Sequence, residues 1–240
     1  MWRGILLNVL ITGGNRGLGL ELVRVFFENG HIVFPVVRRK ESLVFLNKNF
    51  PNRCHPILAD LSKDESIAEI TSQIRTYVNH LDIIINNAGI PGKTYEIEKV
   101  STKELMDLYN VHCLGVVRTV QATLTYLRKS SNPRIINLSS RLGSLSKMAG
   151  GEFAKGRFSY SYRIAKAAQN MLTLCLDQEL EDIPISVTAI HPGKLQTTSG
   201  AYDADMSPED AAKRIYTWLL YSKQDISGKF FEPLVSEMNW

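Results

Sequence analysis

A glycine-rich turn near the start of the chain restricts its fold more than any other feature. The apolar run Ile5–Ile11 leads into Thr12-Gly13-Gly14-Asn15-Arg16-Gly17-Leu18-Gly19, and a helical pattern, Gly19–Asn29, follows. Glycines let the backbone turn tightly and approach a pyrophosphate, and the free N–H groups of a helix N-terminus attract phosphate. This order predicts a dinucleotide-binding turn. Its predicted contacts are Gly13, Asn15, Arg16, Gly17, Leu18 and Gly19.

The rest of the chain repeats this alternation of short apolar runs and longer helical stretches. Continuous apolar runs are typical of strands that are covered on both faces. The strands are expected at Ile5–Ile11, Ile32–Val37, His55–Ala59, Leu81–Ile85, Arg134–Leu138 and Ile185–Ile190, with a weaker one near Gly228–Glu232. The helices are expected at Gly19–Asn29, Ser62–Asn79, Ser101–Lys129 and Tyr160–Glu181.

This alternation predicts an α/β protein with a Rossmann fold. We expect a doubly wound parallel sheet of about seven strands, with helices on both faces and ligands at the carboxyl ends of the strands. The chain has 240 residues, a length that suits one sizeable core, so residues 1–240 are expected to form a single domain.

Composition and charge argue against several other classes of protein. The net charge is only +4 and no run of Lys and Arg reaches five residues, so nucleic-acid binding is not expected. No stretch approaches the roughly 18 apolar residues of a spanning helix, so we expect a cytoplasmic protein without a membrane partner. The scattered Cys54, Cys113 and Cys175 predict buried thiols rather than a disulfide framework, and no metal site is expected.

The residues after the second strand bear on the choice of cofactor. A carboxylate there would hold a ribose 2′-hydroxyl, whereas a cation would accept a 2′-phosphate. The strand runs into Arg38-Arg39-Lys40, and the first acid is Glu41. NADP(H) is therefore predicted, with Arg38 and Arg16 near the phosphate. The alternative is that these cations form a solvated strand end.

Asp60 and Leu61 end the third strand and are predicted to contact the cofactor. Asp60 can accept a hydrogen bond from an adenine amino group. It can also cap a helix that starts near Ser62, because Asp is favoured at that position. The two roles do not exclude each other.

Two further strand ends and one helix carry residues suited to acid–base chemistry. The fourth strand ends in Asn86-Asn87-Ala88-Gly89, and Ser140 follows the fifth strand. Tyr162 and Lys166 are four residues apart, so they share one helix face. A nearby cation lowers the pKa of a tyrosine from about 10 and allows it to exchange a proton with a carbonyl or alcohol oxygen. Ser140 can hydrogen-bond the developing alkoxide.

Similar patterns elsewhere carry less weight. Tyr95 and Lys99 repeat the spacing, but they lie in a loop and no strand-end serine precedes them. Ser144 and Lys147 have the S-x-x-K spacing of some serine enzymes, but the partner motifs of those enzymes and a G-x-S-x-G elbow are missing.

Taken in order, the motifs resemble the short-chain dehydrogenase/reductase family over roughly residues 5 to 197. The resemblance implies a catalytic tetrad of Asn110, Ser140, Tyr162 and Lys166. In it, the lysine also holds the nicotinamide ribose and the asparagine positions a water in a proton relay. The resemblance further implies cofactor contacts from Asn87, Ala88, Gly89, Tyr162, Lys166, Pro192, Gly193 and Thr197. More narrowly, the chain is similar to the C-factor and sniffer-like carbonyl reductase branch.

The resemblance implies hydride transfer between NADP(H) and a small carbonyl or alcohol substrate, with Tyr162 as general acid and base. An alternative is an NADP(H)-binding signalling or redox-sensing protein of the C-factor type with little turnover. Helices Ser101–Lys129 and Tyr160–Glu181 carry small residues and are expected to form a homodimer interface, although burial in the chain's own core would also explain those residues.

Two departures from the family pattern concern the substrate side. Ser140 and Tyr162 are 22 residues apart, and the extra stretch Leu145–Phe158 is expected to form a loop over the substrate mouth. Lys194 follows Pro192-Gly193 and either favours an anionic substrate or faces solvent.

Overall fold

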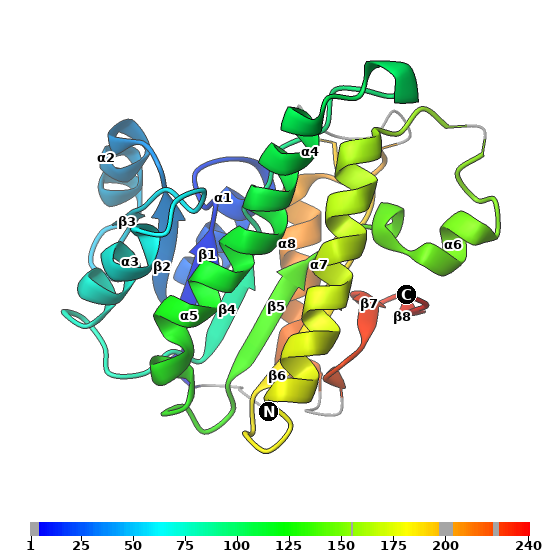
Figure 1. Ribbon diagram of the computed structural model, residues 1–240. Helices are drawn as coiled ribbons and strands as arrows, with labels where there is room; N and C mark the ends of the chain where they lie inside the picture. Colours follow the sequence, from blue (N-terminus) through cyan, green and yellow to red (C-terminus); the bar gives the residue numbers. More distant parts are fainter. Residues whose placement is uncertain (1–4, 155, 197–203, 223–225) are drawn as a thin grey trace.

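One twisted sheet organises the molecule, with helices packed on both of its faces (Figure 1). The computed structural model describes residues 5–154, 156–196, 204–222 and 226–240. The strands are β1 (Asn8–Thr12), β2 (Ile32–Val37), β3 (Ile57–Leu58), β4 (Ile83–Asn86), β5 (Arg134–Leu138), β6 (Ser186–Ile190), β7 (Phe230–Glu232) and β8 (Ser236–Met238).

The strands lie in the order β3-β2-β1-β4-β5-β6-β7-β8. All neighbours from β3 to β7 are parallel, and only β8 runs antiparallel to β7. The predicted α/β class and the doubly wound parallel sheet are therefore confirmed. β1 lies between β2 and β4, so the direction of winding reverses there, and the carboxyl ends of β1 and β4 border the switch point where ligands bind in such sheets.

In the described part of the chain, three short stretches of other helical types supplement the α-helices. The α-helices are α1 (Gly17–Glu28), α2 (Lys40–Asn49), α3 (Ser66–Ile74), α4 (Thr102–Tyr109), α5 (Gly115–Leu127), α6 (Leu145–Ala149), α7 (Tyr160–Glu179) and α8 (Pro208–Tyr221). The shorter segments are the 3₁₀ turns η1 (Ile97–Lys99) and η3 (Arg141–Gly143) and the π-helical turn η2 (Asn110–Leu114).

Two large apolar cores cover the sheet, and a small third cluster lies at β6, β7 and β8. Side chains of β1 alternate between the two large cores, with Val9 and Ile11 on one face and Leu10 on the other. The first core includes buried residues of α1, α2 and α8, and the second includes those of α3 and α5 with partly buried residues of α7. This three-layer arrangement explains why the strands read as continuous apolar runs.

Several elements differ from the sequence prediction. Three helices, α2, α6 and α8, and the strand β8 were not predicted. The stretch Ser101–Lys129 is not one continuous helix, because the π-helical turn η2 separates α4 from α5. The expected loop Leu145–Phe158 begins with helix α6. Of the three cysteines, Cys54 and Cys113 are buried as expected, whereas Cys175 is exposed on α7. None of the described helices is long and apolar enough to cross a membrane.

Candidate active site

A cavity of about 790 Å³ opens at the carboxyl ends of the strands, at the switch point between β1 and β4. It contains most of the residues that the sequence singled out. Those that line it are Gly13, Asn15, Arg16, Gly17, Leu18, Gly19, Arg38, Asp60, Leu61, Asn87, Ala88, Gly89, Ser140, Tyr162, Lys166, Pro192 and Gly193. Asn110 is not among the described residues that line it, and Thr197 lies outside the described part of the chain.

The glycine turn is packed so closely against the end of β4 that side chains cannot be added. A Cβ on Gly19 would lie 2.2 Å from the Gly13 carbonyl oxygen and 2.5 Å from Asn87 Nδ2. Gly13 and Gly17 also have positive φ angles of 69° and 52°, which favour glycine. No side chain caps the N-terminus of α1, so its N–H groups remain available to a phosphate.

Hydrogen bonds join the glycine turn to the loop after β4. The Thr12 hydroxyl accepts from the backbone N–H groups of Asn87 and Ala88, at 3.0 and 2.9 Å. The Asn87 side-chain amide donates in return to the Thr12 carbonyl at 2.8 Å. These bonds fix Asn87 and Ala88 beside the glycine turn, where both line the cavity.

Two cationic side chains follow the end of β2 and line the cavity. Arg38 and Arg39 are exposed and line the cavity, together with Ser42 from the first turn of α2. No acidic residue from this corner lines the cavity within the described chain, apart from Asp60. Ser42 was not predicted, because nothing in the sequence indicated that α2 begins at Lys40 and turns Ser42 toward the site.

Asp60 stabilises a turn rather than the start of a helix. Its Oδ1 accepts hydrogen bonds from the backbone N–H of Ser62 at 3.1 Å and from the Ser62 hydroxyl at 2.8 Å. Helix α3 starts only at Ser66, so the predicted cap of a helix near Ser62 is wrong. Burial raises the pKa of Asp60, but the bonds from Ser62 and the charges of Arg38 and Lys63 outweigh it and leave that pKa below its ordinary value.

Ser140 and Tyr162 meet at the centre of the cavity wall. Tyr162 lies in the first turn of α7, and its hydroxyl hydrogen-bonds Ser140 at the end of β5. Burial of the hydroxyl raises the pKa of Tyr162, and the Ser140 bond offsets this only in part. The sequence predicts that the neighbouring cation lowers this pKa, but Lys166 does not contribute to the shift of Tyr162 in the protein without cofactor.

The position of the Lys166 side chain explains this difference. Its Nζ donates to the Leu138 carbonyl at 2.5 Å and to Gln169 Oε1 at 2.9 Å, and it lies 5.8 Å from the centroid of the Tyr162 ring. Burial lowers the pKa of Lys166 to about 7. The lysine is therefore partly neutral near pH 7, and it faces the end of β5 and its own helix rather than the Tyr162 hydroxyl.

Asn110 and His112 both belong to the π-helical turn η2, but they face different surroundings. The Asn110 amide donates to the Ser62 carbonyl at 3.0 Å, and its oxygen accepts from Arg118 at 2.7 Å. His112 lines the cavity and packs edge-on against Tyr162, with ring centroids 5.5 Å apart and an interplanar angle of 90°. Sequence reasoning missed His112, because a lone histidine in a helical stretch gives no signal of its own.

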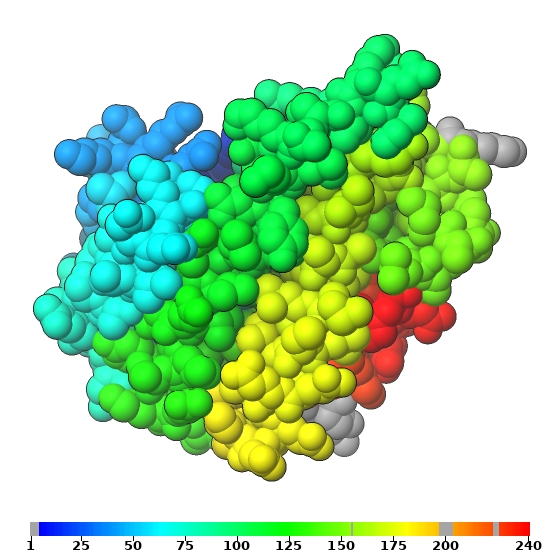
Figure 2. All heavy atoms as spheres, in the orientation of Figure 1, coloured from blue at the N-terminus to red at the C-terminus, as the bar shows by residue number. Residues whose placement is uncertain are grey.

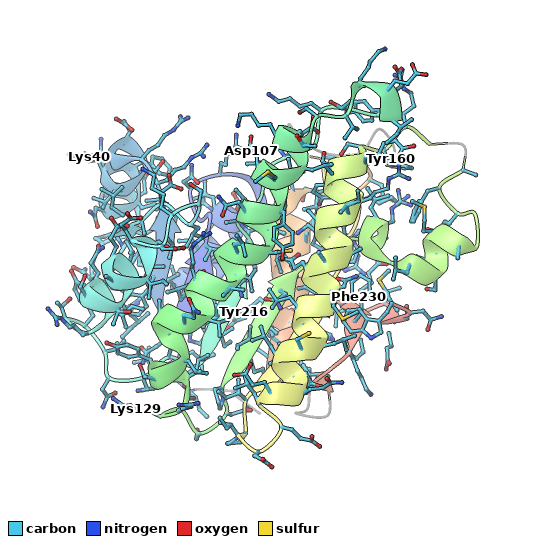
Figure 3. The ribbon with its side chains drawn as sticks, in the orientation of Figure 1. Lys40, Asp107, Lys129, Tyr160, Tyr216 and Phe230 are labelled. Carbon is cyan, nitrogen blue, oxygen red and sulfur yellow. The ribbon has the colours of Figure 1, made fainter. Side chains whose placement is uncertain are left out.

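The cavity lining also includes apolar, aromatic, polar and charged groups from later in the chain. Phe158 and Ser159, from the end of the inserted stretch, lie at the cavity, as do Tyr95 and Leu195. Lys194 also lines the cavity and lies 3.5 Å from Asp205, which supplies an opposite charge. Tyr160, labelled in Figure 3 at the start of α7, packs under the Arg163 guanidinium at 5.0 Å and is not a cavity residue.

Comparison with known families agrees with this geometry. The model of a family described as short chain dehydrogenase matches residues 7–207. The chain belongs to this short-chain dehydrogenase family. Among curated relatives, the C-signal protein of Myxococcus xanthus is 29% identical over 160 residues, which cover 67% of this chain and 93% of that protein.

Solved structures of the same family superpose on nearly the whole chain. An NADPH-bound carbonyl reductase from chicken fatty liver has a TM-score of 0.87 at 28% identity, and the match covers 98% of this chain and 99% of that one. Carbonyl reductase Sniffer of D. melanogaster also has a TM-score of 0.87, at 27% identity, with 98% and 100% covered. The resemblance to the C-factor and sniffer-like branch is thus confirmed.

The glycine turn gives a direct test of the site. Gly19→Ala places a methyl group against Gly13 and Asn87, so we expect it to weaken nicotinamide dinucleotide binding by at least tenfold in a fluorescence titration. Gly115→Ala is the matched control, because a Cβ there meets its nearest neighbour at an ordinary 3.5 Å. Equal affinities in the two variants would contradict a binding role for the turn.

Proposed function

We propose that the protein transfers a hydride between NADP(H) and a carbonyl or alcohol substrate, with Tyr162 as general acid and base. The proposal depends on one observation above all. Ser140, Tyr162 and Lys166 line the same cavity as the glycine turn, so that a cofactor bound along the turn would end beside a proton donor. Residues 1–240 would act as one catalytic domain, and a cytoplasmic location, expected from the sequence, belongs to this proposal.

The residues at the cavity fit an NADP cofactor. The tight backbone approach at Gly19 and the uncapped N-terminus of α1 suit a pyrophosphate. Arg38, Arg39 and Ser42 suit a 2′-phosphate, because guanidinium groups and hydroxyls are good donors to phosphate oxygens. The superposed chicken carbonyl reductase is described as NADPH-bound, which supports the same assignment.

The protein's own residues would move the proton. When bound, NADPH supplies the hydride that reduces the carbonyl carbon. Tyr162 gives its hydroxyl proton to the carbonyl oxygen, and Ser140 donates a hydrogen bond that steadies the oxygen as it gains charge. The raised pKa of Tyr162 keeps this hydroxyl protonated near neutrality, as a proton donor must be. In the oxidation direction, Tyr162 must first lose its proton, and the phenolate would then accept the proton of the alcohol.

Part of the cavity lining favours a hydrophobic or aromatic carbonyl compound. Tyr95, Phe158 and Leu195 supply apolar surface to the cavity. Lys194 lies near Asp205, so its charge is offset, and this weakens the expectation of an anionic substrate.

A second candidate is a nucleotide-binding signalling protein with little turnover. It is favoured by the 29% identity to the C-signal protein of Myxococcus xanthus. The two candidates make different predictions for activity. A signalling protein would bind NADPH tightly and reduce no carbonyl, and in that protein Tyr162→Phe would change nothing measurable.

A homodimer also belongs to this proposal. Helices α4, α5 and α7 form much of one face of the molecule, seen in Figure 2 in green and yellow. Large apolar side chains are exposed on α4 and α7, which pack against each other. They are Met106 (70% exposed), Tyr109 (46%), Ile164 (53%) and Met171 (58%). Burying such a patch against a second copy would remove it from water.

Arg38→Asp tests the cofactor preference. The change places a carboxylate where a 2′-phosphate would sit, so repulsion should weaken NADPH binding by at least 30-fold and improve NADH binding. The measurement is a fluorescence titration of wild type and variant with both nucleotides. Lys48→Asp, a charge change of the same size near the far end of α2, is the control. An unchanged preference in Arg38→Asp would contradict NADP specificity at this corner.

Tyr162→Phe tests the chemistry. The variant lacks the proton that reduction requires, and general acid catalysis contributes about 10² to 10⁴ in rate, so kcat should fall by that factor. NADPH affinity should stay within threefold of wild type, because the ring is retained. The assay follows NADPH absorbance with a panel of aromatic aldehydes and quinones. Full turnover in Tyr162→Phe would rule out the proposed acid.

Glutamate on the exposed apolar face tests the dimer. Light scattering of the wild type should give twice the 27.0 kDa chain mass, and Ile164→Glu with Met171→Glu should give the monomer. Val44→Glu is the control, since Val44 is 64% exposed on α2, which lies at the left in Figure 1, away from α7. A monomeric wild type would contradict the dimer.

A further inference from the structure

His112 is a buried titratable group of the cavity that the proposed chemistry does not yet use, as is His191. His112 is 2% exposed and lines the cavity from the π-helical turn η2. A π-helical turn inserts an extra residue into a helix, and such turns are frequent at functional sites. Here the turn directs Asn110 toward Ser62 and Arg118 and leaves His112 beside Tyr162.

The His112 ring connects two parts of the site. Its Nε2 lies 2.9 Å from the Ile90 carbonyl oxygen and 3.3 Å from the Ile90 nitrogen. The shorter contact favours a proton on Nε2, which then donates to the carbonyl. Ile90 directly follows Asn87-Ala88-Gly89, the segment fixed to the glycine turn. The edge-on contact with Tyr162 lies in the same cavity wall. The ring therefore bridges the cofactor side and the proton donor.

The His112 ring is uncharged at physiological pH, which suits a position beside Lys166. Burial, with a smaller effect from the nearby Lys166 charge, lowers the pKa of His112 to about 3, so the ring is neutral at physiological pH. A neutral ring adds no second cation next to Lys166. The titratable groups that face Lys166 in the described chain are Tyr162 on α7 and His112 and Cys113 on η2.

A purely structural role does not explain the state of the second ring nitrogen of His112, Nδ1. His112 Nδ1 is buried and has no hydrogen-bond partner in the described structure. An unpaired buried nitrogen costs stability relative to an apolar ring of the same shape, and such groups require a functional explanation.

We propose that His112 is a positioning residue, which holds the Tyr162 ring at a fixed distance from the main chain at Ile90 and so sets the proton donor against the cofactor. The inference rests on the proposed function, because it gives His112 a task in that reaction. It also differs from the tetrad implied by sequence resemblance, which places the fourth polar residue at Asn110.

The test compares two substitutions. His112→Phe keeps an aromatic ring but loses the link to Ile90, whereas His112→Gln keeps an N–H at about the depth of Nε2. Misplacement of reacting groups by about 1 Å can cost on the order of 10²-fold in rate. We expect kcat to fall at least tenfold in His112→Phe, with the KM for NADPH within threefold, and to recover at least in part in His112→Gln.

An isotope effect separates positioning from simple loss of structure. With C4-deuterated NADPH, the deuterium effect on kcat should rise in His112→Phe, because the chemical step becomes slower relative to product release. A change in folding alone would lower the active fraction and leave this ratio unchanged. Wild-type kcat and isotope effect in His112→Phe would overturn the proposal.

Histidine NMR gives a measurement that does not depend on turnover or on the stability of a variant at this position. In ¹⁵N-histidine protein, the His112 ring should carry its proton on Nε2, stay neutral from pH 5 to 9 and shift in Tyr162→Phe. A ring that titrates near pH 6.5, or does not respond to Tyr162→Phe, would overturn the placement. A wild type that reduces no carbonyl would instead overturn the proposed function, so the two failures are distinguishable.

Discussion

The contact between the glycine turn and the end of β4 is the constraint on which the rest of the site depends. Thr12, at the end of β1, accepts two backbone hydrogen bonds from Asn87 and Ala88, and the Asn87 amide closes the link in return. The approach is so close that a Cβ at Gly19 would overlap the Gly13 carbonyl oxygen. Because β1 and β4 border the switch point, this one contact fixes both the floor of the cavity and the direction of α1.

A second close approach places the catalytic helix. A Cβ on Gly143 would lie 2.8 Å from the Lys166 backbone, so only a glycine lets α7 pack this near to the turn after β5. Asn170 donates to the Gly143 carbonyl at 3.0 Å, and Asn137 of β5 donates to Thr173 of α7 at 2.9 Å. Buried polar bonds of this kind specify one register of helix against strand. In this register, the Tyr162 hydroxyl hydrogen-bonds Ser140.

The sequence predicted the strands and the cavity better than the helices at the rim. β2 and β5 have the predicted bounds, because continuous apolar runs indicate strands buried on both faces. Helix α2 escaped prediction because it buries only Leu46 and so has little periodicity. Helix α8 had a readable start, Ser207 followed by Pro208, with the Ser207 hydroxyl accepting from the Asp210 N–H. His112 could not be found, because its place depends on the extra residue of a π-helical turn, which has no sequence signature.

Burial moves the pKa values of Tyr162 and Lys166 in opposite directions. It raises the pKa of Tyr162 and lowers that of Lys166 to about 7, so each group is shifted toward its uncharged form. Near pH 7 Lys166 carries its charge only part of the time, so this group can bind or release a proton within the physiological range. A second cation nearby would shift this balance by making the lysine harder to protonate. The neutral His112 avoids that effect, and its low pKa follows from the same burial that tunes its neighbours. Close backbone packing thus fixes the positions of the cavity residues, and their burial sets the charge states of Tyr162, Lys166 and His112.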